Sequence, residues 1–147
     1  MGGFSPDESL FVTAPHYDEG IEWYSFPLVN HAGEISQSEI FDNVDPLPAE
    51  EPDSLNYQTF FITDKIIVAL TRFGRLLLIN IDSRKIVTEL TLQELEPKGY
   101  DERGQETQDP EKIYDYASDL EELKFVAPNQ LVARHNSGKL LSYSLSL

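Results

Sequence analysis

Residues 66–81 read IIVALTRFGRLLLINI, two apolar runs joined by a turn at Gly74. Short apolar runs that are rich in β-branched residues and bounded by a turn signal are typical of buried strands. A single glycine between two strands favours a tight hairpin with positive φ at that glycine, because glycine has no Cβ to clash. The stretch therefore predicts a β-hairpin with Gly74 at its tip.

This hairpin extends into a meander. Residues 82–85 form a second turn signal, and residues 86–90 alternate between apolar and polar side chains as a further strand would. Residues 59–63 offer a fourth strand on the other side. The unit from 59 to 92 is thus a meander of three or four antiparallel strands.

The same pattern occurs twice more. Each copy begins with a Phe, at Phe4, Phe60 and Phe125. A short apolar strand begins six residues after the Phe, and a glycine turn and a second strand follow it. Self-similarity of this kind indicates a repeat architecture. We place the repeats at 4–28, 59–92 and 119–147 of one domain that spans residues 1–147.

Two polar insertions separate the repeats. Residues 29–58 contain seven acidic residues, no Lys or Arg and several prolines, so we expect an exposed loop. Residues 93–118 carry one helical signal, a capping Asp109 followed by Pro110, with Ile113, Tyr116 or Ala117, and Leu120 at helical spacing. The expected fold class is all-β, with antiparallel meanders, long acidic loops between the repeats and at most one short helix.

Alternation along the strands predicts which side chains are buried. Trp23 points to the opposite face from Tyr24 and Phe26, and we expect one of these faces to be core. The wider predicted core comprises Ile67, Ala69, Leu76, Leu78, Tyr143 and Leu145, with Phe60 and Phe125.

The three units resemble blades of a WD40-like β-propeller. Residues 4–13, FSPDESLFVT, resemble the family's turn between first and second strands, and residues 125–133 are similar to them. The hairpin at Gly138 resembles the step into a third strand, with Tyr143 in place of the characteristic Trp. Residues 74–87 are similar to quinoprotein-type blades as well. The Trp-Asp dipeptide of the family is missing, and the resemblance implies an architecture without implying an activity.

Closed propellers use 4–8 blades, whereas this chain offers three repeats. The chain is then part of a longer parent chain, or a homo-oligomer that completes a ring. Otherwise its insertions supply the missing strands, or the hairpins pack as a sandwich or open barrel. Three blades alone would leave unpaired edge strands, which tend to pair with another chain. All four arrangements stay open.

Charge is distributed unevenly. Residues 1–64 contain thirteen Asp and Glu and no Lys or Arg, whereas residues 65–147 contain all eleven Lys and Arg beside another thirteen acids. A surface of this sign repels nucleic acid and anionic lipid, so neither nucleic acid nor membrane is an expected partner. This acidic surface either keeps the protein soluble or binds a basic protein partner. The candidate binding residues are Asp18, Glu19, Glu50, Glu51 and Asp53.

No set of residues predicts catalysis or metal binding. The chain has no cysteine, so it has neither disulfides nor thiolate ligands. Together with the lack of a long apolar run or secretory signal, this favours a cytoplasmic location. His16 and His135 lie in polar hairpin turns, and His31 lies in a polar loop with no evident partner. His16 with Asp18 and Glu19 offers two or three metal ligands in one loop, which do not make a site. We therefore expect no metal, no cofactor and no catalytic residue.

The predicted function is a non-enzymatic protein-interaction module with an acidic face, such as an inhibitor or immunity-type protein for a basic partner. One alternative is a hydrolase or lyase that uses His16 and His135 on a propeller-like assembly. A second alternative is a fragment of a larger propeller without independent activity.

Overall fold

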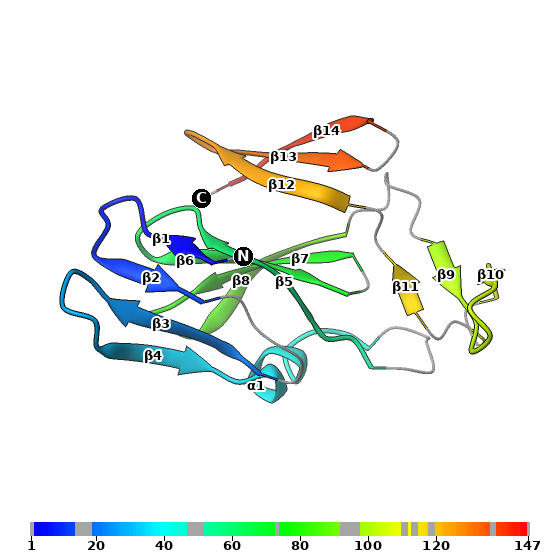
Figure 1. Ribbon diagram of the computed structural model, residues 1–147, viewed down its shortest axis with the longest axis horizontal. Helices are drawn as coiled ribbons and strands as arrows, with labels where there is room; N and C mark the ends of the chain where they lie inside the picture. Colours follow the sequence, from blue (N-terminus) through cyan, green and yellow to red (C-terminus); the bar gives the residue numbers. More distant parts are fainter. Residues whose placement is uncertain are drawn as a thin grey trace.

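The computed structural model describes residues 2–13, 19–46, 52–72, 74–91, 98–109, 112, 115–117, 120–135 and 138–146. Three antiparallel meanders lie side by side as separate sheets, and a smaller sheet stands apart from them (Figure 1). The all-β class is confirmed, with one short helix among the described residues.

Each large sheet keeps its strands in chain order. The first sheet contains β1 (Gly3–Phe4), β2 (Leu10–Val12), β3 (Ile21–Ser25) and β4 (His31–Ile35). The second contains β5 (Leu55–Phe61), β6 (Ile66–Thr71), β7 (Arg75–Asn80) and β8 (Lys85–Thr91). The third contains β12 (Leu120–Val126), β13 (Gln130–His135) and β14 (Leu140–Ser144).

The predicted hairpin is confirmed. Strands β6 and β7 pair from Ile66↔Asn80 to Leu70↔Leu76. Gly74 has φ 81° in the turn between them, and Gly138 has φ 89° between β13 and β14. Both glycines occupy the left-handed region that side chains avoid.

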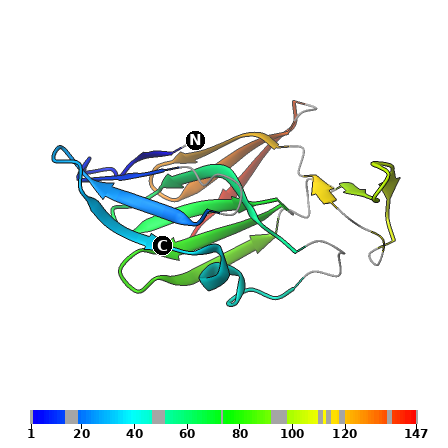
Figure 2. The same ribbon diagram turned by 60° about the horizontal axis from the view of Figure 1, so that its bottom comes forward.

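The second sheet is covered on both faces. Ile67, Ala69, Leu77 and Ile79 pack against Val12, Ile21 and Trp23 of the first sheet. Val68, Leu70, Leu76 and Leu78 pack against Leu123, Leu131 and Leu145 of the third. Because alternate side chains of a strand point to opposite faces, the unbroken apolar runs of β6 and β7 serve two cores, and the sheets form successive layers (Figure 2).

The predicted core is largely confirmed. Ile67, Ala69, Leu76, Leu78 and Leu145 are buried. Phe60, Phe125 and Tyr143 are only half-buried, but they pack against the core between the second and third sheets.

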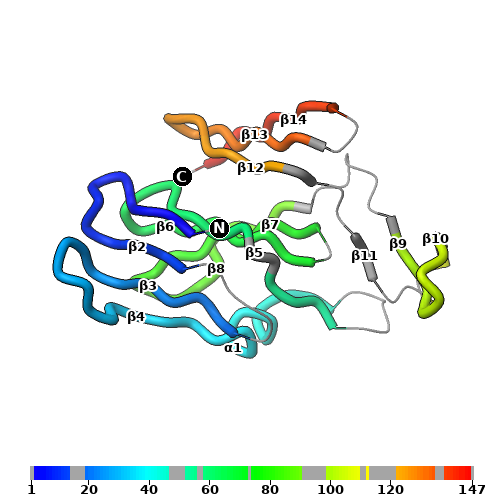
Figure 3. Tube along the Cα trace, viewed as in Figure 1, coloured from blue at the N-terminus to red at the C-terminus, as the bar shows by residue number. Residues whose placement is uncertain are grey.

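The prediction of an exposed loop over 29–58 is wrong, because this segment contains β4, the helix α1 (Gln37–Phe41) and the start of β5 (Figure 3). Strand β4 is an edge strand that buries only Ile35, so its apolar signal is weak. The helix begins with a capping box between Ser36 and Glu39, and Ile40 anchors it in the core.

The predicted helix after Asp109 is wrong at its end. The Lys112 N–H donates to the Asp109 carbonyl at 3.0 Å, as in a single helical turn, and residues 110, 111, 113 and 114 lie outside the described residues. Tyr116 and Ala117 belong to β11 (Asp115–Ala117), which pairs with β9 (Lys98–Tyr100). With β10 (Glu106–Thr107), these strands form the small sheet. A helix of one or two turns is marginal without tertiary packing, whereas strand pairing satisfies the backbone of β11.

The side chain of Asp53 is buried, which contradicts its predicted role in an exposed acidic face. It is 3% exposed, and its Oδ2 accepts a hydrogen bond of 2.9 Å from Nε of Arg75 and lies 2.9 Å from Nη2. Arg75 also donates from Nη1 to the Asp45 carbonyl, at 2.6 Å. The pair therefore ties the segment before β5 to the second sheet.

Truncation of Leu78 tests the core between the second and third sheets. Leu78→Ala should lower the free energy of unfolding by about 2–5 kcal/mol, because it leaves a cavity between two sheets. Val87→Ala on β8, where the side chain is half exposed, should change it by about 0.5 kcal/mol or less. Urea denaturation measures both, and equal losses would contradict the layer arrangement.

Neutralisation of Asp53 tests the buried ion pair. Asp53→Asn should cost up to about 3–5 kcal/mol, because it removes the closer of two carboxylates from the buried guanidinium of Arg75. Only Glu89, 3.5 Å from Nη1 and partly exposed, then remains as a counter-charge. Asp82→Asn is the matched control: Asp82 pairs with Lys65 at the surface, 3.3 Å away, and should cost less than about 1 kcal/mol. Thermal and urea unfolding measure both losses of unfolding free energy. Similar losses for the two variants would contradict the buried ion pair.

Candidate binding surface on the first sheet

The outer face of the first sheet carries a row of aromatic side chains. Strand register sets Phe4 opposite Phe11, Phe11 opposite Tyr24, and Tyr24 opposite His31. Residues that are directly opposite share a face of the sheet. Trp23 points inward and is buried, whereas Phe26 is 42% exposed. The predicted division between Trp23 and its two aromatic neighbours is thus confirmed.

These side chains line a hollow that we call the aromatic groove. It has a volume of about 430 Å³ and is lined by Phe4, Phe11, Thr13, Tyr24, Ser25, Phe26 and Val29. Phe4 packs edge-on against Phe11 and Phe26, with ring centroids 4.9 and 5.0 Å apart. Four of the seven exposed large apolar side chains among the described residues lie between residues 4 and 29. Contiguous exposed apolar surface is a common feature of binding sites, which makes this groove the candidate surface.

A hydrogen-bonded turn holds one wall of the groove. Oδ1 of Asp7 accepts from the Ser5 hydroxyl (2.8 Å) and from the hydroxyl and backbone N–H of Ser9 (2.6 and 2.9 Å). These bonds, led by that of the Ser9 hydroxyl, lower the pKa of Asp7 to about 2. The Asp7 N–H also donates to Asp64 (2.9 Å), which links this turn to the second sheet.

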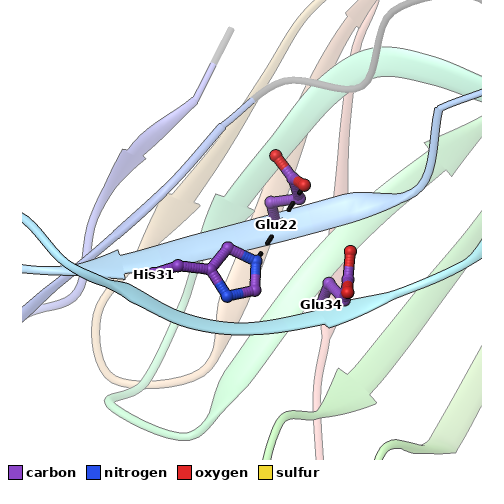
Figure 4. A group of neighbouring side chains, drawn as sticks. All are labelled: Glu22, His31 and Glu34. Atoms are coloured by element: carbon purple, nitrogen blue, oxygen red, sulfur yellow. Dashed lines mark ion pairs between the residues drawn. The ribbon is translucent and has the colours of Figure 1, made fainter.

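Three titratable side chains meet beside the groove, and we call them the Glu–His–Glu cluster. Glu22 on β3 lies directly opposite Glu34 on β4, and a register shift at Trp23/Tyr24 sets His31 across from Tyr24. Figure 4 shows Glu22, His31 and Glu34 on one face of the two strands. Nε2 of His31 is 3.9 Å from Oε1 of Glu22.

Tyr24 connects the groove to the cluster. Its hydroxyl donates to Oε2 of Glu22 at 3.0 Å, and its ring stands edge-on to His31 with centroids 5.5 Å apart. The hydrogen bond to Glu22 raises the pKa of the Tyr24 phenol. On the inner side, Gly33 receives the Trp23 ring: an added Cβ would lie 2.4 Å from Cζ2.

The structure does not gather the predicted acidic residues into one site. Glu19 is exposed and lines a hollow of about 270 Å³ with Glu22 and Glu34. Asp18, Glu50 and Glu51 lie outside the described residues, and Asp53 is buried against Arg75. Sequence reasoning missed Glu22 and Glu34 because their proximity follows from strand register.

The histidines also differ from prediction. His31 lies on β4 beside Glu22, so its placement in a loop without a partner is wrong. His135 ends β13 in the third sheet, and His16 lies outside the described residues.

No family model matches the chain, and no curated protein matches its sequence. Among solved structures, the complex of KlAtg21 with the coiled-coil of AgAtg16 is similar in fold, at 12% sequence identity and a TM-score of 0.54. The match covers 98% of this chain and 35% of that chain, so this chain spans about a third of the structure it matches. Within the described residues, no helix is long and apolar enough to cross a membrane.

The Asp7 turn gives a test of the groove wall. Because the folded pKa of Asp7 is depressed, the turn contributes stability above the ordinary value of 3.8 and loses it as pH falls toward about 2. Ser9→Ala should move the Asp7 titration upward, toward 3.8. Carboxyl chemical shifts measured by NMR follow this directly, and an Asp7 that titrates near 3.8 in the unsubstituted chain would contradict the hydrogen-bond network.

Proposed function

We propose that this chain is a non-enzymatic protein-interaction module whose binding surface is the outer face of the first sheet. The observation that carries the proposal is the aromatic groove, an exposed apolar hollow within the part of the chain that has no Lys or Arg. The partner is a protein segment that combines a large apolar side chain with basic residues.

The groove supplies the apolar part of recognition. Interfaces concentrate their binding energy in a few aromatic and other large side chains that a partner desolvates completely. Phe4 and Phe26 present such surface, and their edge-on contact fixes the rings before a partner arrives. A surface that is already ordered loses less entropy on binding.

The charge around the groove selects a basic partner. Arg84 pairs with Glu39 at 2.8 Å, and Arg75 pairs with Asp53, so the second sheet neutralises some acids of the first 64 residues. Glu22 and Glu34, beside the groove, have no Lys or Arg partner among the described residues. Their field acts over about 8 Å at physiological ionic strength and accelerates association with a basic segment.

The order of the sheets is consistent with a WD40-like propeller arrangement, which we include in the proposal. The matched structure is a complex with a coiled-coil partner, which supports partner binding by this kind of scaffold. The proposal includes an inhibitor or immunity-type protein as one form of this module. It also includes a cytoplasmic location, which the cysteine-free composition favours. The rival occupants of the open face are a second copy of the chain and a further sheet of a longer parent chain.

The hydrolase or lyase alternative receives no support from the described residues. Of the two histidines on which it depends, only His135 is described, at the end of β13. We therefore do not assign a catalytic function.

Selection from a random peptide display library against the immobilised chain tests the proposal. We expect enriched peptides to pair a large apolar residue with Lys or Arg, and their association rate to fall as sodium chloride is raised. Phe4→Ser with Phe26→Ser should weaken a selected peptide by about tenfold or more.

The matched control is Val126→Ser with Leu140→Ser, because these exposed apolar residues lie on the third sheet. Neutral or acidic peptides, or peptides indifferent to the groove variants, would overturn the proposal. Light scattering across concentration distinguishes the rival occupant: self-association that the groove variants abolish would mean that a second copy covers this face.

A further inference from the structure

We propose that Glu22, His31 and Glu34 form a binding site for one divalent transition-metal ion, with Zn²⁺ as the best-matched ion. One ligand atom from each residue lies within 4.8 Å of the other two. This inference does not rest on the aromatic groove or on its partner.

The spacing suits a single ion. Zinc binds imidazole nitrogen and carboxylate oxygen at about 2.0–2.2 Å, which places two ligands of one tetrahedral ion on the order of 3–3.5 Å apart. Nε2 of His31 and Oε1 of Glu22 are already 3.9 Å apart. Both side chains are about half exposed, so rotations about their outer bonds can close the remaining distance.

The ligand types select the class of ion. Mg²⁺ and Ca²⁺ prefer sites made of oxygen alone, whereas an imidazole with carboxylates suits zinc and neighbouring transition metals. Three protein ligands leave a fourth position for water or for a group of a partner. The hollow of about 270 Å³ that Glu22 and Glu34 line gives solvent access to that position.

Electrostatics give an independent reason for a cation. Glu22 and Glu34 are direct cross-strand partners, and like charges in this position destabilise a sheet. Some acids elsewhere in the described structure have basic partners, such as Glu39 with Arg84 and Glu122 with Arg134. Glu34 makes no hydrogen bond or ion pair with any described residue. A dication would cancel both carboxylate charges.

A neighbouring side chain orients two of the three ligands. The Tyr24 hydroxyl holds Oε2 of Glu22, which leaves Oε1 toward His31, and the Tyr24 ring packs against the imidazole. Partners of this kind fix the geometry of metal ligands, and their loss typically costs 10–100-fold in metal affinity. Tyr24 is therefore a positioning residue of the proposed site.

Calorimetric titration of the full, tag-free chain with ZnCl₂ tests the site. We expect one ion per chain. His31→Gln and Glu34→Gln should each weaken zinc binding by at least about tenfold, and Tyr24→Phe by about tenfold. Glu106→Gln is the matched control, because this exposed glutamate lies on β10 of the small sheet, and it should leave binding unchanged.

Thermal unfolding separates a ligand from a residue that only shapes the surface. Without metal, Glu34→Gln should raise the midpoint, because it removes the repulsion from Glu22. With zinc, the unsubstituted chain should gain stability by mass action, and the variant should gain less at the same zinc concentration.

No zinc binding would overturn the inference, as would binding that His31→Gln leaves intact, since that result would mean diffuse attraction to an acidic surface. Neither result bears on the part of the peptide selection that depends on Phe4 and Phe26. Zinc would cancel the charge of Glu22 and Glu34, so the selection is carried out with a chelator present.

Discussion

Strands β6 and β7 bury side chains on both of their faces, because the first sheet covers one face and the third sheet covers the other. The other two large sheets take their positions from this contact. One face of the first sheet is committed to the core, so its aromatic row is left on the outside. The candidate surface is thus the outer face of the first sheet, whereas strands β6 and β7 of the middle sheet are covered on both faces.

Two pairs of acidic residues differ in whether the fold brings an arginine to them. Asp53 and Glu39 meet arginines of the second sheet, which reach back to acids that precede them in the sequence. These pairs fasten α1 and the segment before β5. Glu22 and Glu34 have no such partner among the described residues, so two unneutralised carboxylates lie beside the exposed aromatic side chains. Structural and candidate functional charge are therefore separated by position in the fold.

The parts predicted from sequence are those whose signal is local. Residues 66–70 and 76–79 of the β6–β7 hairpin are all apolar because both faces are buried, and Gly74 marks its turn. Strand β4 escaped prediction because an edge strand needs only one buried residue, Ile35. The burial of Asp53 depends on Arg75, which a different strand presents. The Glu–His–Glu cluster depends on cross-strand register, including a shift that no composition encodes.

The close contact between Gly33 and the Trp23 ring limits which positions of β4 can change during evolution. Inside the sheet, β4 is fixed at two positions: Gly33, where any side chain would strike the indole ring, and the buried Ile35. His31, Ala32 and Glu34 are exposed. Mutation can therefore exchange the outward side chains of β4 with little loss of stability. Related proteins could then bind different partners while they keep the same core.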